Sequence, residues 1–277
     1  MTLQQEIAGN ATQLAVVSLQ PGQSVYCEAG RFLFKTPNVT METRLAGSSD
    51  KEGGGQRSPG GGVGAGGLLR QAMGTSPQTG RRVPTGESAA FQHFTAQDDE
   101  GTVGFAGVLP GEMRTLELDG TRAWYAAKDA FVAAESTVDF GVASQGGRTG
   151  GRTGGQDGEG FVPERLTGRG TVIITGAGTF IDLDPADFGG RVEVATGCVV
   201  AFEDGIRYGV RRVGGLNRPG LINAVPGGEG ICMATLEGSG RVILQSMTLE
   251  SLAAALSKAQ GGDSQSPTGG VFSTPAG

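Results

Sequence analysis

The chain has 277 residues, of which 52 are glycines, and it carries a formal net charge of −6 with a pI near 5.0. This length fits one large β domain or two ordinary domains. The acidic balance disfavours general nucleic-acid binding, because an acidic surface repels the phosphate backbone. We therefore expect no DNA binding and rank RNA binding low.

Short β-strands between glycine and proline turns dominate the chain. Asp119-Gly120 and Asp204-Gly205 suit hairpin turns, because both positions tolerate positive φ. In chain order, the segments that we expect to be strands include Arg31–Phe34, Val39–Thr43, Thr102–Ala106, Thr115–Leu118, Thr171–Ile174, Arg191–Ala195, Cys198–Phe202 and Arg241–Gln245.

Four segments depart from this strand pattern. Residues 47–84 and 146–157 are glycine-rich and are interpreted as loop insertions. Near the C-terminus the apolar spacing becomes helical, and Thr248 can cap a helix over about 249–259. The polar segment 261–277 that follows is expected to be a disordered tail.

Three stretches of the chain look alike, which indicates an internal triplication. In each, an apolar run leads to a turn residue, and a second apolar run begins nine residues after that residue. A Gly-Glu pair follows in each copy, and we expect a later hairpin after each pair. The turn residues are Gly30, Asp129 and Gly197, and the pairs are Gly86-Glu87, Gly158-Glu159 and Gly228-Glu229.

The triplication predicts an all-β fold in a single domain over 1–260. We expect three units, at about 1–106, 107–184 and 185–247, packed around a pseudo-threefold axis as a β-sandwich or prism, with one short C-terminal helix. Each unit has too few strands to bury its apolar face alone, so the units must pack on one another. Leftover sheet edges would favour self-association, so we expect a homo-oligomer, with a trimer as one candidate size.

The repeated Gly-Glu pairs allow two interpretations. Glu87, Glu159 and Glu229 could form a ring of carboxylates that binds a cation or the basic groups of a partner. Alternatively, each glutamate accepts hydrogen bonds from turn N–H groups or pairs with a nearby arginine, while the glycine supplies an unusual backbone angle. We favour the second interpretation, because repeated structure alone explains repeated residues.

Few residues point to catalysis or to a cofactor. Cys27, Cys198 and Cys232 are odd in number and widely spaced, which favours small buried hydrophobes over disulfides, reactive thiols or metal ligands. His93 is the only histidine, so a metal site with two imidazoles in one chain is excluded. We expect a non-enzymatic protein with no metal, cofactor or catalytic residue.

Three further patterns have ordinary explanations. Residues 62–67 match G-x-G-x-x-G, but they lack the flanking strand and long helix of a dinucleotide site, so a mobile glycine loop is the better interpretation. Residues 148–155 lack the aromatic side chains of an RNA-binding segment and are interpreted as a linker. Mild basic clusters are interpreted as solvated faces or salt-bridge partners, with an anion or lipid-headgroup patch as the alternative. These clusters are Arg81-Arg82, Arg207, Arg211-Arg212 and Arg218.

A series of motifs in a fixed order carries a resemblance to a known family. The motifs include Glu28 to Gly30, Asn38 to Thr43, Gly86 to Ser88, Pro110-Gly111, Gly158 to Phe161, Leu166 to Gly170, Val200 to Phe202 and Gly228 to Val242. With them, about residues 1–255 resemble the tryptophan-RNA-binding-attenuator-like family, whose eukaryotic member is called altered inheritance of mitochondria twenty-four. The resemblance implies attenuator-like β repeats that can oligomerise and, from the mitochondrial relative, a scaffold role at the inner membrane. It transfers no catalytic residue, ligand pocket or RNA contact.

The leading hypothesis is a structural or scaffold protein that self-associates and binds protein partners, in membrane organisation or a stress response. The alternative is a small-molecule-binding module, which would show a deep apolar cleft between two repeats. RNA binding and a hydrolase that uses His93 rank lower. The N-terminus lacks a secretory signal and no apolar run is long enough to span a membrane, so we expect a cytoplasmic protein with peripheral membrane contact at most.

Overall fold

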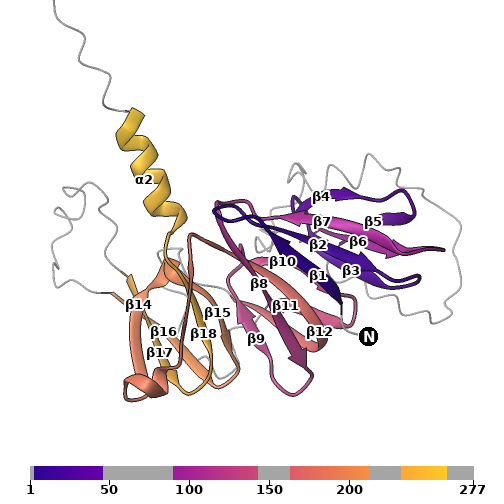
Figure 1. The fold of residues 1–277 in the computed structure, drawn as a ribbon. Helices are drawn as coiled ribbons and strands as arrows, with labels where there is room; N and C mark the ends of the chain where they lie inside the picture. The colour runs from indigo at the N-terminus through magenta and orange to yellow at the C-terminus, as the bar shows by residue number, and fades with distance from the viewer. Residues whose placement is uncertain (1–2, 46–89, 143–162, 213–231, 261–277) are drawn as a thin grey trace, which may run out of the picture.

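The computed structural model describes residues 3–45, 90–142, 163–212 and 232–260. Within these residues strands form nearly all of the regular structure, and one α-helix follows the last strand (Figure 1). The mostly β fold with a short C-terminal helix is thereby confirmed. The segments 47–84, 146–157 and 261–277 and the three Gly-Glu pairs lie outside the described residues.

The strands form sheets that stack along the molecule, and we number these sheets from the N-terminal end. The first sheet has the order β1 (Gln4–Ala8), β2 (Leu14–Leu19), β7 (Gly101–Ala106) and β4 (Phe32–Lys35). At the other end, the fourth sheet has the order β14 (Arg191–Ala195), β17 (Cys232–Gly238) and β16 (Ile206–Arg212).

An 11-stranded sheet lies between these two and bends at β12, which divides it into the second and third sheets. The second has the order β5 (Val39–Leu45), β6 (Ala90–Ala96), β3 (Ser24–Glu28), β10 (Phe131–Glu135), β12 (Glu164–Ala177) and β8 (Gly111–Asp119). The third has the order β11 (Val138–Val142), β12, β9 (Trp124–Ala126), β15 (Val199–Glu203), β18 (Val242–Gln245) and β13 (Phe180–Leu183).

Three apolar clusters fill the spaces between successive sheets. The first and second sheets enclose a cluster around Phe94 and Phe105, and the second and third enclose one around Phe131 and Trp124. The third and fourth enclose a cluster around Phe202, Tyr208 and Leu236. The two inner sheets therefore have core on both faces, and the two outer sheets on one face each.

The residue patterns of the strands agree with this stacking. Buried and half-buried residues alternate in β2, as expected for a strand with one covered face. All five residues of β10 are buried, because β10 belongs to an inner sheet. The expected strands are found, most with ends within four residues of those expected, but β12 begins seven residues before the expected Thr171 and is 14 residues long.

The same set of pairings occurs three times along the chain. In the first set, β6 lies between β5 and β3, and β7 lies between β4 and β2. In the second, β11 and β9 flank the first half of β12, and β10 and β8 flank its second half. In the third, β17 lies between β16 and β14, and β18 lies between β15 and β13. The pairs β3–β10 and β9–β15 join one set to the next.

The expected hairpins are wrong. Asp119-Gly120 links β8 to β9 and Asp204-Gly205 links β15 to β16, but neither link connects strands that pair with each other. The later hairpins are also absent from the described strands: β6 does not pair with β7, nor β17 with β18, and β12 is one continuous strand. These turns instead carry the chain from one sheet to the facing sheet, which local sequence does not distinguish from a hairpin.

The expected packing around a pseudo-threefold axis is not confirmed. Closure of three such sets would bring β4 against β14. Among the described strands β4 pairs only with β7 and β14 only with β17, and the two lie at opposite ends of the molecule in Figure 1. The boundary between the second and third sets also differs from the expected one, because β13 pairs with β18.

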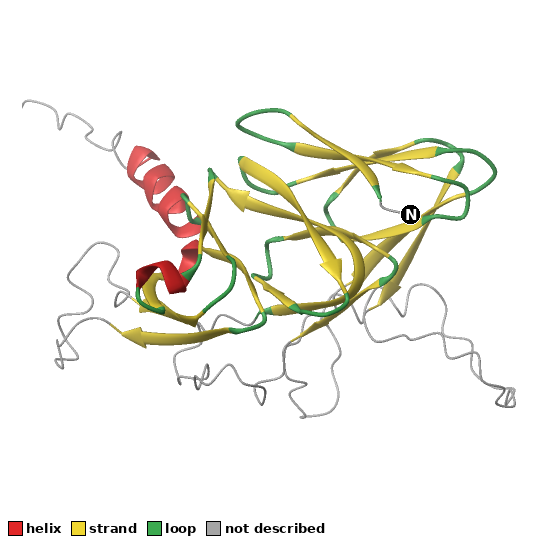
Figure 2. Cartoon of the chain, turned by 60° about the horizontal axis from the view of Figure 1, so that its bottom comes forward, coloured by secondary structure: helices red, strands yellow, loops and turns green. Residues whose placement is uncertain are grey.

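The C-terminal helix α2 (Leu249–Gln260) begins where the sequence predicts. The Thr248 side chain accepts a hydrogen bond from the Ser251 N–H at 3.1 Å, which caps the first turn. The helix projects away from the sheets in Figures 1 and 2, and Leu249 and Leu256 are exposed.

Candidate functional site

Two joints hold the three strand sets together, and both are antiparallel pairings of one strand from each set. In the joint between β3 and β10, Tyr26 faces Ala134. In the joint between β9 and β15, Tyr125 faces Phe202, and these two rings stack with centroids 5.4 Å apart. Each joint therefore combines backbone hydrogen bonds with an apolar pair.

In the first sheet β4, and in the fourth sheet β14, has the same position in its strand set as a strand of the two joints. Neither has a joint partner among the described strands. On β4, Leu33 is 50% exposed and Phe34 is 42% exposed. In β10 and β15 the apolar residues are buried. Leu33 and Phe34 belong to a terminal sheet with core on one face, whereas neighbouring sheets cover the residues of β10 and β15. Among the described strands, β4 and β14 each keep one edge unpaired, and such an edge can accept another strand.

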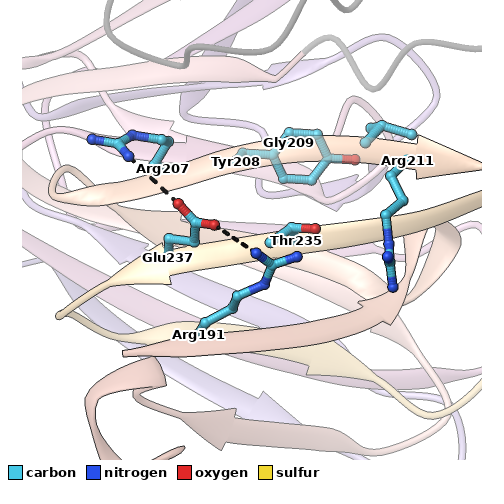
Figure 3. A pocket seen from close by; sticks show the side chains of 8 residues that line it. Arg191, Arg207, Tyr208, Gly209, Arg211, Thr235 and Glu237 are labelled. Carbon is cyan, nitrogen blue, oxygen red and sulfur yellow. Dashed lines mark hydrogen bonds and ion pairs between the residues drawn. The ribbon is translucent and has the colours of Figure 1, made fainter. Parts of the chain in front are cut away.

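The outer face of the fourth sheet carries a hollow of about 230 Å³ between charged side chains (Figure 3). The Glu237 carboxylate lies 3.3 Å from Arg191 and 3.4 Å from Arg207. The Glu193 carboxylate lies 2.8 Å from Arg191 and 2.6 Å from Arg211, and hydrogen bonds from these two arginines lower the pKa of Glu193.

Each of these two glutamates thus bridges two arginines. The three arginines together carry one more positive charge than the two glutamates neutralise. Arg207 and Arg211 belong to the basic clusters noted in the sequence, for which solvated faces or salt-bridge partners is the favoured interpretation. The structure confirms that interpretation for both. The hollow is charged, open and confined to one sheet, so it differs from an apolar cleft between two units.

A buried polar cluster lies beside the β3–β10 joint. Arg31 is 3% exposed, donates a hydrogen bond to the Asp129 carbonyl at 2.8 Å and lies 3.6 Å from the Glu28 carboxylate. Glu164 is also buried, and its Oε2 atom has no hydrogen-bond partner among the residues that the structure describes. Burial, together with the carboxylates of Glu28 and Asp129, raises the pKa of Glu164 to about 9.

Glu164 therefore carries a proton at neutral pH. A strongly perturbed carboxyl is a candidate for a functional group, but a structural acid between two strand sets has the same property. No sequence pattern marks Glu164, because it lies in an ordinary stretch after Pro163 and its burial depends on strands from two sets.

One hydrogen bond that recurs in all three strand sets was not predicted from the sequence. In each set, the side chain six residues after the turn residue accepts a hydrogen bond from a backbone N–H in or next to β7, the second half of β12 or β18. The contacts are Thr102 N to Thr36 Oγ1 at 3.0 Å, Thr171 N to Glu135 Oε2 at 2.7 Å and Arg241 N to Glu203 Oε2 at 3.2 Å. The common spacing of six was available in the sequence, but the change from threonine to glutamate conceals it.

The predicted turn residues occupy corresponding places. Gly30 lies between β3 and β4 with φ of +92°, Asp129 lies between β9 and β10, and Gly197 lies between β14 and β15. Gly30 and Asp129 lie beside the same joint, since the residue after Gly30, Arg31, donates a hydrogen bond to the Asp129 carbonyl at 2.8 Å.

The structure describes the surroundings of Cys27, Cys198 and His93. Cys27 is buried, and burial raises the pKa of its thiol to about 12, which agrees with a small buried hydrophobe. Cys198 is half-buried. His93 stacks on Tyr26 at 5.4 Å and faces Glu42, which pairs with Arg44.

Two features of the described ranges concern metal ions and membranes. No group of three or more His, Cys, Asp or Glu residues there is arranged to hold a metal ion. No α-helix in those ranges has the length and apolar character needed to cross a membrane.

The chain is similar to a protein of known sequence, to a solved structure and to one family model. The chain is similar to an uncharacterised protein, M6_Spy0233, of Streptococcus pyogenes serotype M6, with 28% identity over 248 residues, 88% of this chain and 86% of that protein. The fold of this chain is similar to the crystal structure of SPYM3_0169 from Streptococcus pyogenes, with a TM-score of 0.64 and 23% identity. The match covers 93% of this chain and 99% of that one. Residues 5–247 match the family described as mitochondrial biogenesis AIM24, so the chain belongs to the AIM24 family.

Proposed function

We propose that this chain is a non-enzymatic scaffold, built from three copies of one six-strand unit, that self-associates and binds protein partners. The units are β2–β7, β8–β12 and β13–β18, with β12 serving as two strands. The threefold recurrence of the strand pairings supports this division. The shared spacing of the turn residues and of the backbone contacts at Thr36, Glu135 and Glu203 supports it as well.

One observation carries the self-association. The units inside the chain are joined by edge-strand pairing, and both ends of the series keep one such edge unpaired within the described strands. Exposed edges with free backbone donors and acceptors recruit further strands. A role in membrane organisation follows the family's description as a mitochondrial biogenesis family, and the cytoplasmic location stays a prediction from the sequence.

The small-molecule alternative receives less support. It requires an apolar cleft between two units, whereas the hollow in Figure 3 is charged and lies on one sheet. We therefore retain the scaffold as the proposed function.

Sedimentation equilibrium or light scattering of the full chain tests the proposal. We expect a mass that is a multiple of 28.1 kDa and that rises with concentration at micromolar protein. A mass of one chain throughout that range would contradict self-association.

A further inference from the structure

We infer that β4 of one copy pairs antiparallel with β14 of a second copy, so that chains associate head to tail through a third joint. This inference rests on the proposed self-association and names the two surfaces that form it. Because each copy carries one strand of each kind, the contact is heterologous and continues from copy to copy until a rotation closes it.

The two terminal sheets complete each other. The second sheet has the order β5-β6-β3-β10-β12-β8, and the third has the corresponding order β11-β12-β9-β15-β18-β13. The fourth sheet ends as β16-β17-β14, and the first begins as β4-β7-β2. Joined at β14 and β4, they give the same six-strand order as the two inner sheets.

The internal joints also fix the register. The strands β4, β10 and β15 share a bulge at one place, between Phe32 and Phe34, Phe131 and Ala133, and Val199 and Ala201. Phe34 thus corresponds to Ala133 and Ala201, which face Cys27 and Ala126. Val194 lies three residues before its turn residue, as Cys27 and Ala126 do. In the third joint Phe34 therefore faces Val194, and Lys35 faces Glu193.

The Lys35–Glu193 pair replaces the apolar pair of the internal joints. There the same two positions hold Ala134 with Tyr26, and Phe202 with Tyr125. A charge on each open edge discourages non-specific strand addition, while the opposite signs favour this particular partner.

A second charge contact follows from the same register. It brings Arg191 close to Pro37 and to the acidic turn at Asp98 to Glu100. Asn38 holds that turn in place by donating hydrogen bonds to the carbonyls of Asp99 at 2.9 Å and Glu100 at 3.1 Å.

Apolar burial points to the same contact. Leu33 is 50% exposed, whereas its counterparts Val132 and Val200 are 0% and 1% exposed. Neighbouring sheets cover those two valines, so a second copy joined at β4 would cover Leu33 by packing one of its sheets on the outer face of the first sheet.

Pro37 makes the third joint weaker than the inner two. Its counterparts Ser136 and Asp204 donate backbone hydrogen bonds across their joints, at 3.1 Å and 2.8 Å. Proline has no N–H to donate, so the third joint lacks this bond. We therefore expect an association that depends on protein concentration.

Cysteine cross-linking tests the register. In the full chain with Cys198→Ser and Cys232→Ser, and with buried Cys27 left in place, Lys35→Cys combined with Glu193→Cys should form covalent dimers and higher species under mild oxidation. The matched control combines Lys35→Cys with Val210→Cys, which is 38% exposed and lies on β16 at the far edge of the fourth sheet. Equal cross-linking of the two pairs would overturn the register.

Charge exchange tests the pair independently. Lys35→Glu should weaken association roughly tenfold, and adding Glu193→Lys should restore part of it, because opposite charges face each other again. The unfolding curve of Lys35→Glu should match that of the parent, whereas the double variant also loses the ion pairs of Glu193 with Arg191 and Arg211, so its association is measured at a temperature where its unfolding curve shows it folded. Association that ignores both changes would overturn the β4–β14 joint and leave the proposed self-association standing. A one-chain mass for the unaltered protein would remove both.

Discussion

Replacement of Glu164 by glutamine is expected to stabilise the protein by about 3 kcal/mol at pH 7 and to have little effect near pH 4. The folded protein holds this carboxyl with a pKa raised from 4.5 to about 9. Between those values the folded state binds a proton that the unfolded state releases, so the stability of the parent falls as pH rises. Glutamine removes that proton uptake, and its unpartnered amide takes the place of an acid whose Oε2 is already unpartnered.

Urea unfolding at several pH values measures this effect. The stability of the parent should fall relative to that of Glu164→Gln as pH rises from 4.5 to 9, while the exposed control Glu42→Gln should follow the parent. Glu42 is suitable because its side chain is 65% exposed and pairs with the exposed Arg44. Parallel pH profiles for the parent and Glu164→Gln would show that the site is more hydrated than its burial indicates.

Replacement of Gly111 by alanine is expected to destabilise the fold by about 3 kcal/mol or more. A Cβ atom at this position would lie 1.9 Å from the Gly176 carbonyl oxygen and 2.7 Å from the Gly178 nitrogen, both of which are backbone atoms. The surrounding backbone cannot easily move, because Gly178 N–H donates to the Pro110 carbonyl at 3.0 Å and Glu112 N–H donates to the Gly178 carbonyl at 3.1 Å.

The matched control is Gly141→Ala on β11, where a Cβ would meet nothing within 4 Å. It should change stability by less than about 0.5 kcal/mol. Urea unfolding of the two variants under the same conditions separates backbone crowding from the general effect of replacing glycine in a strand. Similar stability of Gly111→Ala and the parent would mean that β8 and the β12–β13 turn can separate without penalty.

The strands and the helix were predictable because each depends on local pattern. Alternation in β2 and the cap at Thr248 can be read from neighbouring residues, and both are confirmed. The partners of the strands were not predictable in this way. Asp204-Gly205 has the residues of a hairpin turn, yet it passes the chain to the facing sheet, and that choice depends on which apolar faces the whole chain must cover.

The candidate site was predictable only in outline. The short strands of the sequence indicate that leftover edges favour association, but which edges stay unpaired depends on the strand order of the folded chain. Lys35 and Glu193 are ordinary surface charges in the sequence, and their correspondence with Ala134 and Tyr26 emerges only from the registers of the inner joints. The burial of Glu164 likewise arises from strands that are distant in sequence.

Hydrogen exchange of the backbone amides, followed by mass spectrometry from submicromolar to high micromolar concentration, tests the edge-pairing claim most directly. Peptides covering β10 and β15 should be protected throughout, because their joints lie within one chain. Peptides covering β4 and β14 should gain protection as concentration rises, while β16, at the other edge of the fourth sheet, should not. If the amides of β4 and β14 exchange at a rate that does not depend on concentration, or if β16 gains protection equally, then copies of the chain do not associate by pairing β4 with β14.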